Sequence, residues 1–118
     1  MSPERAKVFI SEDDSKWRKK AEEALFAGGH QVVLSATNLK DSLAAIERFA
    51  EFGVQVAIID RNLDGTLEGD DGQAVLAAIR QKTPQVKTIG FSVLEVPGVD
   101  IDLGKHKDYD LGKTVTEI

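Results

Sequence analysis

Short strand-like segments alternate with segments of helical period along most of this chain, and this alternation restricts the fold more than any other feature. The strand-like runs cover 8–10, 31–34, 54–59 and 86–92, and the segments of helical period cover 16–27, 40–52 and 73–82. Strands that alternate with single helices through short connections form parallel sheets covered on both faces. We therefore expect an α/β fold with right-handed crossovers.

Residues with defined conformational preferences mark the ends of these helical segments. Asp14 can cap a helix that begins at about Lys16, and the pair Gly28-Gly29 predicts its end. Gly53 ends the second helical segment, and Pro84 follows the third. The predicted elements are thus separated by residues that stop helices.

The last quarter of the chain departs from the alternation. Residues 93–113 contain one proline and three glycines and show no helical period. They also contain a near-repeat, in which 100–105 reads DIDLGK and 108–113 reads DYDLGK. Either copy can form a last strand followed by a lysine, so the position of the fifth strand stays open.

Length and composition exclude several classes of function. The chain has 118 residues, which suits one domain, and its formal net charge of -5 argues against nucleic acid as a direct partner. It has no cysteine, so disulfides and thiolate metal sites are excluded. No secretory signal and no apolar run long enough for a membrane span is present. We expect a cytoplasmic protein that binds neither membrane nor nucleic acid.

Polar side chains follow three of the predicted strands. Glu12 and Asp13 come after the first strand, Asp60 after the third and Ser92 after the fourth. In an open parallel sheet, ligands bind beyond the carboxyl ends of the strands. Three crowded carboxylates repel one another unless a cation neutralises them, and Mg²⁺ suits a site with few protein ligands. The sequence therefore predicts a magnesium site at this sheet edge.

Four segments together resemble the receiver domain of bacterial response regulators. They are Ile10–Asp14 (ISEDD), Ala57–Leu63 (AIIDRNL), Thr88–Ser92 (TIGFS) and Lys113. The match runs in order over nearly the whole chain. The resemblance implies a flavodoxin-like doubly wound five-stranded parallel sheet with strand order 2-1-3-4-5. In this sequence, the fourth and fifth helices of that fold are expected to be reduced or absent.

The resemblance also implies roles for individual residues. Asp60 would accept the phosphoryl group, and Glu12, Asp13, Asp60 and the backbone carbonyl of Asn62 would hold Mg²⁺. Ser92 and Lys113 would contact the phosphoryl group. Ser92 and the aromatic residue Tyr109 would be the switch residues, which respond to phosphorylation. The implied protein is a single receiver domain over 1–118 without an output domain. It would take its phosphoryl group from a histidine kinase or phosphotransfer protein, signal to an unidentified protein target, and not act as a turnover enzyme.

Two alternatives stay open at this level. Lys105 ends the first copy of the near-repeat and could replace Lys113, although the distance from Ser92 favours Lys113. The second alternative is a degenerate receiver that acts as an unphosphorylated interaction module. It is suggested by the long loop after Asp60 and by the proline and glycines in 93–113. The intact acids, hydroxyl and lysine favour the phosphoacceptor interpretation. His30 is expected to be a loop residue without a ligand role.

Overall fold

A computed structural model describes residues 5–61, 70–92, 96–105 and 110–118. These residues form five strands and five helices. In chain order they are β1 (Lys7–Ser11), α1 (Ser15–Ala27), β2 (Gln31–Ala36), α2 (Leu39–Ile46), α3 (Phe49–Phe52), β3 (Val56–Ile59), α4 (Asp70–Lys82), β4 (Lys87–Ser92), β5 (Ile101–Gly104) and α5 (Leu111–Glu117).

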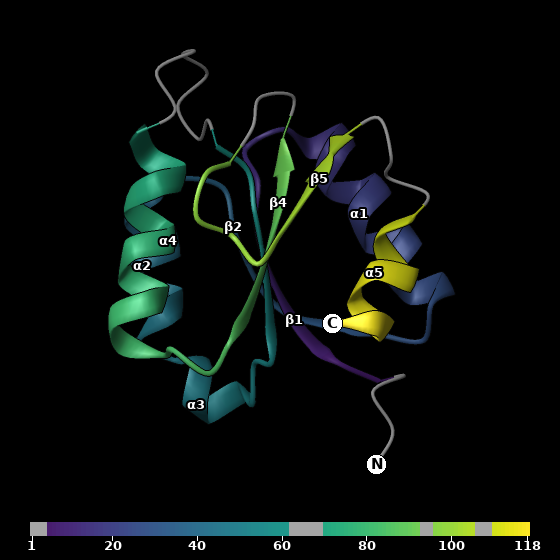
Figure 1. Cartoon of the computed structure of the whole chain (residues 1–118), viewed down its shortest axis with the longest axis horizontal. Coiled ribbons are helices and arrows are strands. Elements are labelled where there is room, and N and C mark those ends of the chain that lie inside the picture. The colour runs from purple at the N-terminus through teal and green to yellow at the C-terminus, as the bar shows by residue number, and fades with distance from the viewer. Residues whose placement is uncertain (1–4, 62–69, 93–95, 106–109) are drawn as a thin grey trace.

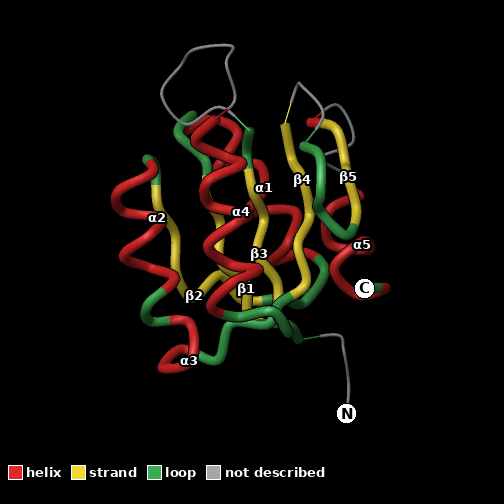
Figure 2. Tube along the Cα trace, turned by 60° about the vertical axis from the view of Figure 1, so that its left-hand side comes forward, coloured by secondary structure: helices red, strands yellow, loops and turns green. Residues whose placement is uncertain are grey.

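The strands form one parallel sheet in the order β2-β1-β3-β4-β5, which confirms the predicted topology. Helices α2 and α4 cover one face of the sheet, and α1 and α5 cover the other (Figure 1). Strands β2 and β5 lie at the two edges (Figure 2). No helix in the described parts of the chain is long and apolar enough to cross a membrane.

Two hydrophobic clusters, one on each face, hold the helices against the sheet. Strand β3 is buried along its whole length, and its side chains alternate between the clusters. Ala57 and Ile59 pack with α2 and α4, whereas Val56 and Ile58 pack with α1 and α5. A strand buried on both faces reads as a continuous apolar run, which explains why 54–59 is such a clear strand signal.

The ends of α1 agree with the predicted ones, whereas α4 begins at Asp70, three residues before its predicted start, and the second helical segment differs more. The Asp14 carboxylate accepts hydrogen bonds from the backbone N–H groups of Lys16 and Trp17, at 2.8 and 3.2 Å, and so caps α1. The predicted helix over 40–52 is instead two helices, α2 and α3, and it ends at Gly53 with a left-handed φ of 68°. The break lies next to Phe49, which packs against Phe9 with 5.0 Å between ring centroids.

The connection from β4 to β5 crosses the sheet without a helix in its described residues, 96–100. Side chains of α4 hold it in place: Gln73 Nε2 donates to the Pro97 carbonyl at 3.2 Å, and an Arg80 guanidinium nitrogen donates to the Gly98 carbonyl at 2.8 Å. Asp100 accepts hydrogen bonds from the backbone N–H and the hydroxyl of Thr88. The fourth helix of the receiver fold, which would lie between β4 and β5 and is not α4 of this structure, is therefore missing from 96–100, in line with its expected reduction.

Helix α5 is short, at seven residues, but it is closely packed on the end of α1. A Cβ on Gly112 would lie 2.7 Å from the Ala24 carbonyl oxygen, so only glycine permits this approach. His30 is buried, and its ring links the segment just before β1 to α5. Its Nδ1 accepts from the Ala6 N–H at 3.0 Å, which leaves Nε2 as the donor to the Gly112 carbonyl at 3.0 Å. His30 lies in the loop before β2, as expected, but it is buried there and its ring also holds α5.

Candidate phosphoryl-transfer site

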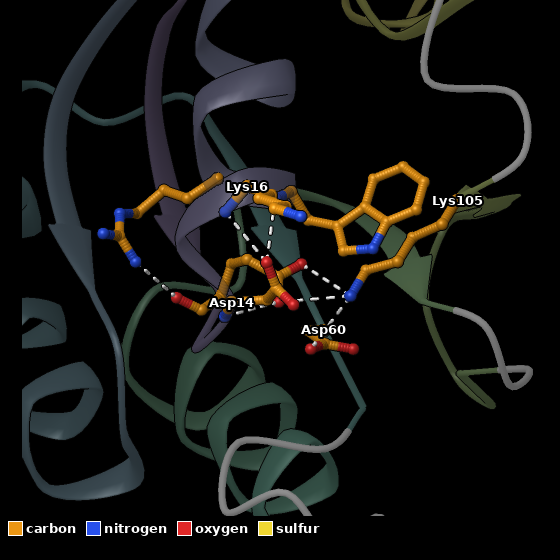
Figure 3. A network of polar contacts seen from close by, with 7 residues as sticks. Asp14, Lys16, Asp60 and Lys105 are labelled. Atoms are coloured by element: carbon orange, nitrogen blue, oxygen red, sulfur yellow. Dashed lines mark hydrogen bonds and ion pairs between the residues drawn. The ribbon is translucent and has the colours of Figure 1, made fainter.

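The carboxyl ends of four strands bring together the acidic residues and a lysine. Glu12 directly follows β1 and Asp60 follows β3, and their backbone N–H groups continue the sheet by donating to Ala36 and Ser11 carbonyls, both at 3.0 Å. Ser92 is the last residue of β4, and Lys105 follows β5. Figure 3 shows the Lys105 side chain reaching toward Asp60 across this edge.

The three predicted metal-ligating carboxylates converge. One oxygen from each of Glu12, Asp13 and Asp60 lies within 4.8 Å of the other two. Glu12 and Asp60 are almost completely buried, at 1% and 3% exposure, whereas Asp13 is partly exposed. The cluster therefore opens to solvent on the side of Asp13.

Burial and crowding make this site costly for negative charge. Burial, together with the neighbouring Asp60 carboxylate, raises the pKa of Glu12 to about 8. Burial and the charge of Asp60 also raise the pKa of Asp13 above its ordinary value of 3.8. A cluster of three crowded carboxylates, two of them almost completely buried, fits a hard divalent cation, since such an ion binds oxygen ligands and offsets the repulsion.

Lys105 supplies the positive charge in this pocket. Its ammonium lies 3.0 Å from Glu12 Oε1, donates to Glu12 Oε2 at 3.2 Å and lies 3.4 Å from Asp60 Oδ2. Its side chain is 8% exposed, so water screens these pairs little.

The prediction of Lys113 at this position is wrong. Lys113 is exposed on α5, because β5 is formed by the first copy of the near-repeat and not by the second. Eight residues, 93–100, separate Ser92 from β5, and no helix occupies the described part of this connection, 96–100. The distance from Ser92 therefore did not identify the lysine of the site.

Of the remaining predicted site residues, the structure describes Ser92 but not Asn62 or Tyr109. Ser92 is buried at the carboxyl end of β4, beside Gly104 of β5. Asn62 and Tyr109 lie outside the described residues.

Two residues near the site were missed by sequence reasoning. At Gly72, in the first turn of α4, a Cβ would lie only 2.5 Å from the Asp60 carbonyl oxygen. Gly72 also donates its N–H to the Arg61 carbonyl at 2.9 Å, so it fixes the backbone after Asp60. Trp17, half-buried on α1, has its ring centroid 5.4 Å from the Lys105 ammonium. The sequence signals that could have indicated these residues were a glycine in the first turn of a helix, for Gly72, and an aromatic residue in the first turn of α1, for Trp17.

Neither a protein-family model nor a curated protein matches this sequence. Solved structures match the fold. The signal receiver domain of NarL from Mycobacterium tuberculosis is 25% identical with a TM-score of 0.76, over 98% of this chain and 96% of that one. CheY in the CheX-CheY-BeF3-Mg²⁺ complex from Borrelia burgdorferi is 15% identical with a TM-score of 0.73, over 93% and 88% of the two chains.

A longer protein gives a similar match. RcsB, a response regulator from Salmonella typhimurium, is 20% identical with a TM-score of 0.73 over 93% of this chain. The present chain spans only 57% of that RcsB chain. These likenesses confirm the resemblance noted in the sequence: the chain has the fold of response regulator receiver domains.

Proposed function

We propose that this protein is a phosphoacceptor receiver domain and that Asp60 takes the phosphoryl group. The observation that carries the proposal is the convergence of Asp60 with two further carboxylates, within 4.8 Å, and with the Lys105 ammonium, 3.4 Å away. Phosphoryl transfer needs chiefly a positioned nucleophile and positive charge around the phosphoryl oxygens. This pocket offers a buried carboxylate as nucleophile and an ammonium beside it.

The transfer is a displacement at phosphorus. A carboxylate oxygen of Asp60 forms a new O–P bond while the P–N bond to the imidazole of a donor phosphohistidine breaks. The imidazole nitrogen keeps the electron pair of that bond and takes up a proton. The product is an acyl phosphate on Asp60, which water later hydrolyses to inorganic phosphate and the free carboxylate. The domain is thus a self-modifying switch and not a turnover enzyme.

Other side chains of the pocket support this step. Lys105 would pair with a phosphoryl oxygen, and the Ser92 hydroxyl would donate a hydrogen bond to another. Glu12, Asp13 and Asp60, with the Asn62 carbonyl that the resemblance adds, would hold Mg²⁺. When bound, that ion supplies charge neutralisation at the phosphoryl oxygens and among the acids. The Mg²⁺ and BeF3 named in the Borrelia CheY structure support this choice of ion.

The partners follow from the chemistry. The donor would be a histidine kinase or a phosphotransfer protein, and the output would be a contact with another protein. The net charge of -5 argues against direct binding of nucleic acid by this chain. A degenerate, unphosphorylated interaction module is the weaker alternative, since it would have no need of three buried or partly buried acids matched to a buried lysine.

Beryllofluoride, which mimics a phosphoryl group on a carboxylate, tests the proposal in solution. We expect it to change Trp17 fluorescence only when Mg²⁺ is present, because Trp17 lies against Lys105. Asp60→Asn, which lacks the acceptor carboxylate, is the matched control and should show no change. A wild-type signal that is insensitive to Mg²⁺, or that persists in Asp60→Asn, would contradict the proposal.

A further inference from the structure

Trp17 forms one wall of the pocket that holds Lys105. It lies in the first turn of α1, whose start is fixed by the hydrogen bond from the Trp17 N–H to Asp14. Its ring meets Phe91 of β4 edge-on, at 81° and 6.0 Å between centroids. The Lys105 ammonium lies 5.4 Å from the Trp17 centroid, within the range of a cation–π contact. The ring is therefore held by two elements and in turn contacts the ammonium.

The other contacts of the ammonium change during the proposed reaction. In the structure it is shared between Glu12 and Asp60. A divalent cation would compete for both carboxylates, and phosphorylation would convert Asp60 into an acyl phosphate. The attraction of the indole ring for the ammonium depends on neither event, because the ring carries no net charge. Trp17 is thus the contact that can persist when the ionic partners change.

We infer that Trp17 is a positioning residue, which holds the Lys105 ammonium beside the acceptor carboxylate through a cation–π contact. The inference rests on the proposed phosphoryl transfer to Asp60 and goes beyond it, by assigning the orientation of the lysine to an aromatic residue on α1. Lysine has a long flexible stem, so a fixed wall reduces the number of conformations in which its ammonium leaves the pocket.

Two substitutions of Trp17 separate the cation–π contact from simple packing. Trp17→Phe keeps an aromatic face, whereas Trp17→Leu keeps apolar volume without a π system. With Mg²⁺ and acetyl phosphate, we expect Trp17→Leu to slow phosphorylation about fivefold and Trp17→Phe to stay within about twofold of wild type, as the strength of such contacts indicates. Equal rates for the two variants would overturn the inference.

A double-mutant cycle tests whether the effect runs through Lys105. In a Lys105→Ala background, Trp17→Leu should have no further effect on the rate. The exposed Lys20, whose ammonium lies 4.7 Å from the same ring, provides the matched control. Lys20→Ala should leave the rate unchanged. A fivefold effect of Trp17→Leu that persists without Lys105 would contradict a positioning role.

A readout without metal or phosphoryl donor completes the test. In the wild-type protein, the ring current of Trp17 should displace the NMR signals of the Lys105 ε-methylene group upfield, and Trp17→Leu should abolish this displacement. Unchanged ε-methylene signals would overturn the inference. A wild-type protein that forms no adduct but shows the upfield signals would instead refute the proposed function, so the two failures are distinguishable.

Discussion

Glu12→Gln should make the metal-free protein more stable, by an amount that grows with pH. In the folded protein the pKa of Glu12 is about 8, against an ordinary value of 4.5, chiefly because the carboxyl is buried and lies beside Asp60. A carboxyl with a raised folded-state pKa binds its proton more tightly when folded. Its contribution to stability is therefore complete below pH 4.5 and is lost as the pH rises to about 8. Glutamine resembles the protonated form at every pH.

The size of the effect follows from the same pKa. The gap between 4.5 and about 8, at about 1.4 kcal/mol per pH unit, sets a ceiling of about 5 kcal/mol on the difference in unfolding free energy. A small movement of the Lys105 ammonium toward an ionised Glu12 would reduce this difference in unfolding free energy. We therefore expect Glu12→Gln to exceed the wild type by more than about 2 kcal/mol at pH 8.5, and to match it near pH 4.5.

Urea unfolding followed by circular dichroism, in EDTA and at several pH values from 4.5 to 8.5, measures this difference. Asp14→Asn is the matched control. The backbone N–H of Trp17 lowers the pKa of the exposed Asp14 below its ordinary value of 3.8, so this variant should add no pH dependence in that range. A difference between Glu12→Gln and wild type that is constant with pH, or that shrinks as pH rises, would refute the reasoning.

Three further predictions concern the lysines and the packing of α5. Lys105→Ala should slow phosphorylation by acetyl phosphate at least tenfold, roughly the effect of one lost charge-assisted contact. Lys113 is exposed, so Lys113→Ala should be phosphorylated at the wild-type rate. A slow Lys113→Ala and an unaffected Lys105→Ala would instead show that Lys113 is the lysine of the site. His30→Ala removes the hydrogen-bond partner of the Ala6 N–H and of the Gly112 carbonyl. It should lower the unfolding free energy, measured by urea titration, by about 3 kcal/mol. A loss below about 1 kcal/mol would contradict the anchoring role. Gly112→Ala places a Cβ 2.7 Å from the Ala24 carbonyl oxygen and should cost about 1–3 kcal/mol; hydrogen exchange in α5 should rise, and unchanged protection would refute the close approach.

Most of the fold could be predicted because its signals are local. The buried runs of β1, β3 and β4, the cap at Asp14 and the stop at Gly53 depend on neighbouring residues alone. The topology and the convergence of Glu12, Asp13 and Asp60 follow from a general rule, since parallel strands present their carboxyl ends at one edge. The acidic part of the site was predictable for that reason.

The lysine could not be assigned from sequence because two copies of one motif compete for β5. Their local preferences are nearly the same, and the choice depends on long-range contacts. Asp100 bonds to Thr88, and Arg80 of α4 holds the crossover beside it. These contacts place the first copy next to β4 and leave the second copy for α5. The burial of His30 was not predicted for a similar reason, since its three hydrogen-bond partners, Ala6, Gly112 and Thr116, are all distant in sequence.

The central claim is that Asp60 is a phosphoacceptor, and intact-mass spectrometry tests it most directly. The protein is incubated with Mg²⁺ and acetyl phosphate, in parallel with Asp60→Asn and with an EDTA-treated sample. We predict that the wild type alone gains the mass of one phosphoryl group, that hydroxylamine removes it as expected for an acyl phosphate, and that neither control is modified. An unmodified wild type, or an Asp60→Asn protein that gains the same mass, would contradict the claim.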